Sequence, residues 1–131
     1  MIKKGIVIVM MVVTLATLRS NAADNQPQLI KMKSTAYCLD GVTASGQYVR
    51  NGICACGDPA LFGKTVILYQ RLPDNNIGDI IGIYEVLDTG CASTVIDVWC
   101  SNIDLCQEYM NRVYEDGCKG RVYVQVIDAE G

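Results

Sequence analysis

Short runs in which apolar and polar residues alternate recur along this chain and leave few folds open to it. In residues 29–39, Ile30, Met32 and Ser34 alternate with lysines and a threonine that can face water. Side chains of a strand point alternately to its two faces, so a period of two predicts a strand with one buried face. Similar patterns, rich in β-branched and aromatic residues, predict further strands. These span residues 47–56, around a turn at Asn51-Gly52, and residues 64–72, 80–87, 95–100 and 120–127.

One segment has the period of a helix instead. Residues 102–115 carry an apolar stripe, with Ser101 as the expected cap, Asp104 as the acid of a capping box and Gly117 as the stop. The expected stripe consists of Ile103, Cys106, Met110, Val113 and Tyr114. Six or seven short strands and one helix before the last strand predict an all-β fold. We expect a small closed barrel, because closure removes strand edges that would otherwise be unpaired.

The start of the chain differs in composition from the rest. Lys3 and Lys4 precede an apolar run at residues 6–18, and the small residues Ser20 and Ala22 suit a signal peptidase. The run is about 13 residues long, against the roughly 20 that span a bilayer, so an uncleaved membrane anchor is the weaker alternative. Residues 1–22 are therefore predicted to be a signal peptide, and the mature protein is predicted to be secreted without stable insertion in the membrane.

The charge of the mature chain argues against nucleic acid as a partner. Removal of residues 1–22 leaves eight basic against 14 acidic residues, a net charge of −6. The chain contains no histidine. This excludes Ser-His-Asp and Cys-His nucleophile systems and any imidazole base. In an enzyme of this composition, carboxylates would have to carry the proton transfers.

Seven cysteines lie in the mature part, where an exported chain meets oxidising conditions, so disulfides are expected. The odd count leaves one thiol over, and the sequence does not choose among the pairings. A zinc site is the alternative, but the Cys54-x-Cys56 spacing is tighter than a zinc knuckle uses. We therefore expect no metal and no cofactor. The candidates for disulfides are Cys38, Cys54, Cys56, Cys91, Cys100, Cys106 and Cys118.

Three aspartates lie at strand ends or inside a strand: Asp58, Asp88 and Asp97. Burial raises the pKa of a carboxyl group and a like-charged neighbour raises it further, which lets an aspartate act as a general acid. The alternative for Asp58 and Asp88 is a turn residue that bonds local backbone amides. That alternative is weaker for Asp97, because strand interiors disfavour aspartate.

Around these aspartates the sequence resembles the three-aspartate (3D) domain family. The matching runs are residues 34–37, 43–46, 57–59, 62–66, 87–90, 96–97 and 120–124. The resemblance implies a six-stranded double-psi β-barrel over residues 34–131, preceded by a tether and the start of the first strand at residues 23–33. Such barrels are related to lytic transglycosylase A and to stationary-phase muralytic proteins. Family members cleave the β-1,4 bond between N-acetylmuramic acid and N-acetylglucosamine and leave a 1,6-anhydro end.

The resemblance also implies roles for single residues. Asp97 would be the acid and base, Asp88 the second acid that tunes it, and Asp58 a support for both. Hydroxyls that could bond sugar groups, and aromatic rings that could stack on sugars, lie nearby, although an aromatic residue of a barrel is more often core. The expected substrate-binding residues are Thr43, Ser45, Thr89, Tyr37 and Trp99, with Tyr48 as a further stacking candidate.

One departure from the family pattern affects the site. Residues 91–95 are shorter than the glycine-rich, lysine-bearing loop that family members have before the last aspartate, and Cys91 could pin this loop through a disulfide. Two classes of function therefore stay open. The first is a secreted enzyme of cell-wall turnover that acts on peptidoglycan glycan strands. The second is a barrel that binds wall glycan or a partner without cleaving it; cleavage of another β-1,4 glucan is a minor third.

Overall fold

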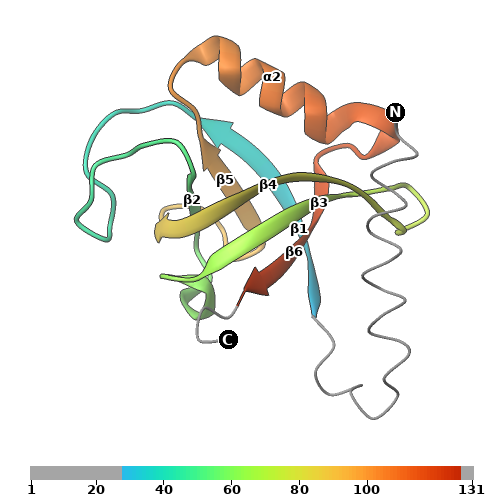
Figure 1. Ribbon diagram of the computed structural model, residues 1–131, viewed down its shortest axis with the longest axis horizontal. Coiled ribbons are helices and arrows are strands. Elements are labelled where there is room, and N and C mark those ends of the chain that lie inside the picture. Colours follow the sequence, from blue (N-terminus) through green and yellow to red (C-terminus); the bar gives the residue numbers. More distant parts are fainter. Residues whose placement is uncertain (1–27, 128–131) are drawn as a thin grey trace.

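The computed structural model describes residues 28–127 (Figure 1). The predicted signal peptide, residues 1–22, and the part of the tether up to residue 27 lie outside the described residues. Six strands, one α-helix and two single-turn 3₁₀ helices make up the described part. In chain order they are β1 (Leu29–Tyr37), β2 (Ile53–Cys56), η2 (Pro59–Leu61), β3 (Thr65–Arg71), β4 (Ile77–Asp88), β5 (Val95–Trp99), α2 (Ile103–Tyr114), η3 (Glu115–Gly117) and β6 (Arg121–Ile127).

The six strands form one sheet that closes on itself. The hydrogen-bonded order is β1-β5-β2-β4-β3-β6, and β6 pairs back onto β1. The β1/β5 and β2/β4 pairs are parallel, whereas the other four pairs are antiparallel. This confirms the prediction of a mostly β protein with one short α-helix before the last strand. Closure pairs every strand on both sides, which satisfies the backbone groups that an open sheet would expose.

The strand patterns read from the sequence hold for five of the six strands. Strands β3 and β4 form the expected antiparallel hairpin. The run at residues 47–52, however, forms no strand: the chain there has only an isolated bridge between Val42 and Tyr48, and the strand begins at Ile53. Gly52 has a φ of +93° and ends a turn, so the preceding residues leave the sheet. The prediction of a strand at residues 47–50 was therefore wrong, whereas the turn expected at Asn51-Gly52 is confirmed.

Alternation divides core from surface most clearly on β1, whereas β2 is buried at every residue. On β1, Met32 and Ser34 are buried while Lys31, Lys33 and Thr35 are exposed. The apolar side chains inside the ring form one core cluster. Its fully buried members include Val66, Leu68, Val86, Ile96, Val122 and Val124.

Helix α2 lies over one end of the closed sheet and packs against β1 and β6 (Figure 1). Its cap is Asn102, whose side chain accepts a hydrogen bond of 2.9 Å from the amide of Leu105, so the prediction of Ser101 as cap was wrong. The expected stripe also needs correction: the buried positions are Cys106, Tyr109 and Val113, whereas Ile103 and Tyr114 are exposed. No helix in the described part of the chain has the length and apolarity needed to cross a membrane.

Tyr109 is buried on α2, although the predicted stripe contained Met110 instead. Its burial is possible because the Tyr109 hydroxyl has a hydrogen-bond partner inside the protein. The hydroxyl groups of Tyr109 and Ser34 lie 2.6 Å apart, and Ser34 Oγ also donates to the carbonyl of Ile96 at 3.0 Å. A buried tyrosine needs such a partner to offset the loss of water. The pair therefore ties α2 to the inside of the sheet.

The predicted disulfides are not formed in this structure, where all seven cysteines are free. Several of them occupy core positions, and Cys54, Cys56 and Cys118 are fully buried. A buried cysteine packs like a small apolar side chain. The buried cysteines therefore contribute to the apolar core of the closed sheet.

Candidate active site

Strand pairing brings two of the three predicted aspartates into one row. On neighbouring strands Thr35 is the register partner of Asp97, Asp97 of Ala55, and Ala55 of Asp88. Directly paired residues of a sheet have side chains on the same face. The row alternates along each strand with core residues such as Val98, so its side chains point to the outer face of the ring.

A bulge in β4 decides that Asp88 belongs to this row. Cys54 pairs with Val86, but the next residue, Ala55, pairs with Asp88 rather than Leu87. The extra residue shifts the alternation by one position and turns Asp88 to the outer face. The backbones of Asp88 and Asp97 are then two strands, roughly 10 Å, apart, with Ala55 on the strand between them.

Asp97 has the surroundings of a proton donor. Its Oδ1 atom accepts a hydrogen bond of 2.7 Å from the hydroxyl of Thr35. Partial burial raises the pKa of Asp97, the bond from Thr35 lowers it, and the charge of Asp88 raises it, so the pKa lies above the ordinary value of an aspartate. The protonated form is therefore favoured at a higher pH than in a solvated carboxyl group.

Asp88 is held as an acceptor by three donors. The amides of Ala44 and Thr89 each donate to its Oδ1 atom at 2.9 Å, and the hydroxyl of Tyr37 donates to Oδ2 at 3.3 Å. Burial, followed by the charge of Asp88, raises the pKa of Tyr37, so its phenol keeps the proton that it donates. Three donors suit an ionised carboxylate, which can accept all of them. Asp88 is thus a positioned negative charge beside Asp97.

Thr43 and Ser45 shape the loop that supplies the Ala44 amide. The two hydroxyls lie 2.7 Å apart, and the Ser45 amide donates to the carbonyl of Leu87 at 3.1 Å. Thr43 is buried, with 5 % of its surface exposed, so its hydroxyl is used within the loop. Ser45 is partly buried, whereas Thr89 is exposed next to Asp88.

The aromatic candidates fall into two groups. The indole of Trp99 is buried, with 8 % exposed, and its Nε1 atom donates to the carbonyl of Leu39 at 2.8 Å, so the ring anchors the start of the loop after β1. Its expected role as an open stacking platform does not fit this burial. Tyr37 is partly buried against Asp88. Tyr48, on the loop that follows β1, is 70 % exposed.

Asp58 does not join the other two aspartates. Its side chain caps η2 by accepting a hydrogen bond of 3.0 Å from the amide of Ala60. Within residues 28–127 no hydrogen bond connects it to Asp88 or Asp97. Asp58 therefore acts as a turn residue that bonds a local backbone amide, as the alternative interpretation of the sequence predicted. Asp58 could support the site only by stabilising the turn after β2.

The loop before β5, residues 89–94, is held by backbone contacts. The amide of Gly57 donates to the carbonyl of Ala92 at 3.3 Å, and a Cβ atom at Gly57 would collide with the carbonyl oxygen of Cys91. The prediction that a disulfide of Cys91 holds this loop is not met in the structure. The Cys91 thiol is free and donates to the carbonyl of Val95 at 3.5 Å. Burial, followed by the charge of Asp97, raises the pKa of Cys91 to about 11.

Three groups of this site were not identified from the sequence: the Thr35 hydroxyl, the Ala44 amide and the spacer Ala55. Thr35 and Ala44 lie in runs that carry the family resemblance, but only strand pairing reveals what they contact. No group of three or more cysteine, aspartate and glutamate side chains is arranged to hold a metal ion in the described part of the chain.

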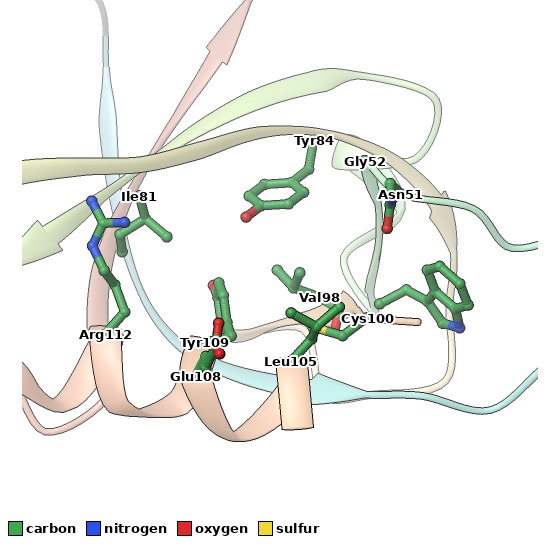
Figure 2. A pocket seen from close by; sticks show the side chains of 11 residues that line it. Asn51, Gly52, Ile81, Tyr84, Val98, Cys100, Leu105, Glu108, Tyr109 and Arg112 are labelled. Atoms are coloured by element: carbon green, nitrogen blue, oxygen red, sulfur yellow. The ribbon is translucent and has the colours of Figure 1, made fainter. Parts of the chain in front are cut away.

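A pocket of about 440 Å³ lies elsewhere, between β4 and α2 (Figure 2). Figure 2 shows the rings of Tyr84 and Tyr109 on its two sides and Arg112 at one end. Val98 also lines it. None of Asp58, Asp88 and Asp97 lines this pocket.

Comparison of the chain with family models, with curated proteins and with solved structures gives no match.

Proposed function

We propose that this protein is an exported lytic transglycosylase that cleaves the β-1,4 bond between N-acetylmuramic acid and N-acetylglucosamine in peptidoglycan. The observation that carries the proposal is the row in which Asp88 and Asp97 flank Ala55 on the outer face of the sheet. Glycoside cleavage generally uses two carboxyl groups in different protonation states. Here partial burial favours the protonated form of Asp97, whereas three hydrogen-bond donors surround the carboxylate of Asp88.

In the proposed reaction Asp97 is the acid and then the base. Its proton goes to the bridging oxygen as the bond from the anomeric carbon to that oxygen breaks, which releases the N-acetylglucosamine end. The muramic C6 hydroxyl then attacks the anomeric carbon, and its proton returns to the Asp97 carboxylate. The product carries a 1,6-anhydro ring, and no water is consumed. The raised pKa of Asp97 supports the first step because it keeps the proton available.

Asp88 supplies the negative charge that the reaction needs. Positive charge develops at the sugar ring as the glycosidic bond breaks, and a carboxylate fixed beforehand by three donors stabilises it without having to reorganise. In this scheme Tyr37, Thr43 and Ser45 position Asp88 and its loop. Thr89 and the exposed ring of Tyr48 are the groups of this region that can reach a sugar directly.

We further propose that the closed sheet is a double-psi β-barrel. Two parallel pairs, β1/β5 and β2/β4, within an otherwise antiparallel ring of six strands support this assignment. The active row spans β1, β5, β2 and β4, the four strands of these two pairs.

Digestion of purified peptidoglycan tests the activity. Mass spectrometry of the products should reveal 1,6-anhydro muropeptides, with no saccharide ends produced by water. Asp97→Asn should lower the rate roughly 100- to 10,000-fold, because a positioned general acid contributes that much. Asparagine keeps an oxygen that can accept the bond from Thr35, so the thermal midpoint of the variant should not fall.

A matched control is Asp104→Asn, since Asp104 is an exposed carboxyl on the first turn of α2. Its rate should equal that of the unmodified protein. Release of anhydro products by Asp97→Asn at the rate of the unmodified protein would remove Asp97 from the mechanism.

A glycan-binding role without cleavage is the second candidate. It is favoured by the short loop at residues 89–94, which departs from the family pattern beside Asp88 and Asp97, while Thr89 and Tyr48 stay exposed for binding. Retention of the protein on insoluble peptidoglycan, with no anhydro product between pH 4 and pH 8, would support this candidate and contradict the enzyme.

A further inference from the structure

Three thiols from three different elements meet at the end of the sheet that α2 covers. Cys38 directly follows β1, Cys100 directly follows β5, and Cys106 lies in the first turn of α2. The amide of Cys100 donates to the carbonyl of Tyr37 at 2.8 Å, which extends the parallel β1/β5 register so that Cys38 and Cys100 are neighbours. All three cysteines pack in the same apolar cluster.

Cys106 is the common member of this thiol cluster, which consists of Cys38, Cys100 and Cys106. The side chains of both Cys100 and Cys38 lie close enough to that of Cys106 to raise the pKa of its thiol. Burial is the main reason that the pKa of Cys106 is raised to about 12, so the thiol is protonated in the reduced protein. Thiols this close need little backbone movement to form a bond, provided that their Cβ atoms approach to about 4 Å.

The three thiols differ in access. Cys38 is partly exposed, whereas Cys100 and Cys106 have 8 % and 6 % of their surface exposed. A reagent from solution therefore meets Cys38 first. Thiol–disulfide exchange begins with the sulfur that the reagent can reach and ends with a neighbour that displaces it.

We propose that Cys38, Cys100 and Cys106 form an oxidisable site in which a disulfide between Cys38 and Cys106 ties the first turn of α2 to the end of β1. Cys100 stays a thiol beside this bridge. The oxidant is a disulfide in a small molecule or in a thiol oxidoreductase. The site lies apart from the row of Asp88 and Asp97, and the inference does not depend on glycan cleavage.

The chemistry balances in two exchanges. The thiolate of Cys38 attacks the donor disulfide, forms a mixed disulfide and releases one donor thiolate. The thiolate of Cys106 then attacks the Cys38 sulfur and expels the second donor thiolate. Two protein thiols are oxidised to one disulfide, one donor disulfide is reduced to two thiols, and the two protons pass to the released thiolates.

The bridge would alter the stability of α2 and the edge of the pocket in Figure 2. Cys100, which stays unpaired next to the bridge, lines that pocket. The bridge closes a long segment of chain and so restricts the unfolded state. We expect oxidation to raise the thermal midpoint on the order of 10 °C, with proteolysis of α2 slowed in parallel.

The test treats the full chain with oxidised glutathione or with dithiothreitol, blocks free thiols with iodoacetamide and maps the digest without reduction. The oxidised sample should contain one linked peptide pair that joins Cys38 to Cys106. Cys100→Ser should retain this link. Cys106→Ser should lose it and accumulate a glutathione adduct on Cys38, because the displacing thiol is absent.

Cys38→Ser is a second variant that should lose the link, and it does not alter the buried face of α2. Cys91→Ser is the matched control, since Cys91 is partly exposed like Cys38 but lies in another loop, and it should retain the link. Seven alkylated cysteines after treatment with oxidised glutathione would overturn the proposal. A link that joins any other pair in the unmodified protein would overturn it as well.

Discussion

Thr35 on β1 and Asp97 on β5 are register partners in a parallel pair of strands, and the Thr35 hydroxyl donates a 2.7 Å hydrogen bond to Oδ1 of Asp97. The bond favours the charged form of the carboxyl group, while burial and Asp88 favour the neutral form. The protonation of the proposed acid is therefore set by two neighbours that act in opposite directions. Each can be changed separately.

Thr35→Val should move the alkaline limb of the pH–rate profile to higher pH. The reaction needs protonated Asp97, so the rate falls as the pH rises through the pKa of this group. Valine has nearly the shape of threonine but cannot donate, and loss of the bond raises the pKa further. Initial rates of anhydro-muropeptide release between pH 4 and pH 9 measure the limb. An unchanged limb would show that Thr35 does not tune the acid.

Asp88→Asn should move the same limb to lower pH, because removal of the negative charge also removes a cause of the raised pKa of Asp97. The maximal rate should fall on the order of 100-fold, since a preorganised charge is lost. Asparagine keeps an Oδ1 atom that can accept from Ala44 and Thr89, so circular dichroism and the thermal midpoint serve as controls for folding. A shift in the same direction as Thr35→Val would contradict the assigned roles.

Gly57→Ala should disturb the loop at residues 89–94. The added methyl group collides with the carbonyl of Cys91, and both partners are backbone, so neither yields easily. We expect a loss of about 1–3 kcal/mol in the free energy of unfolding, measured with urea, and a larger relative loss of activity than of stability. Ser93→Ala, an exposed change in the same loop, should leave both quantities unchanged. Equal stability of Gly57→Ala and the unmodified protein would argue against this contact.

Tyr109→Phe tests the link between α2 and the sheet. It removes the hydroxyl that lies 2.6 Å from Ser34 Oγ. A buried hydrogen bond contributes about 1 kcal/mol net, which for a domain of this size corresponds to a thermal midpoint lower by roughly 4–8 °C. Tyr114→Phe is the matched control because Tyr114 is 52 % exposed, and its midpoint should not change. Equal midpoints for the two variants would mean that the buried bond contributes nothing.

Local patterns were sufficient to predict most of the elements. The alternation that predicts β1 depends on the residues of that strand alone, and so does the hairpin of β3 and β4. The errors occurred where the outcome depends on contacts distant in sequence. Residues 47–50 have the composition of a strand but pair only through the isolated bridge between Val42 and Tyr48. Tyr109 is buried because its hydroxyl bonds that of Ser34, which is 75 positions away.

Only part of the candidate site could be predicted from the sequence, because its geometry also depends on contacts between residues distant in the chain. The sequence identified Asp88 and Asp97 but grouped Asp58 with them, although Asp58 caps a local turn. The sequence also led us to expect disulfides among the cysteines, because composition indicates a compartment and does not give the positions of sulfur atoms.

By itself, the order of residues determined most of the strands, the place of the helix and which acids are available, because these depend on neighbours along the chain. Only the tertiary structure decided that Asp88, Ala55, Asp97 and Thr35 share one row. That row depends on which strands pair and on the bulge that excludes Leu87 from the β2/β4 register. A shift of one residue turns a side chain to the opposite face of a sheet, and this shift is set by packing between distant strands.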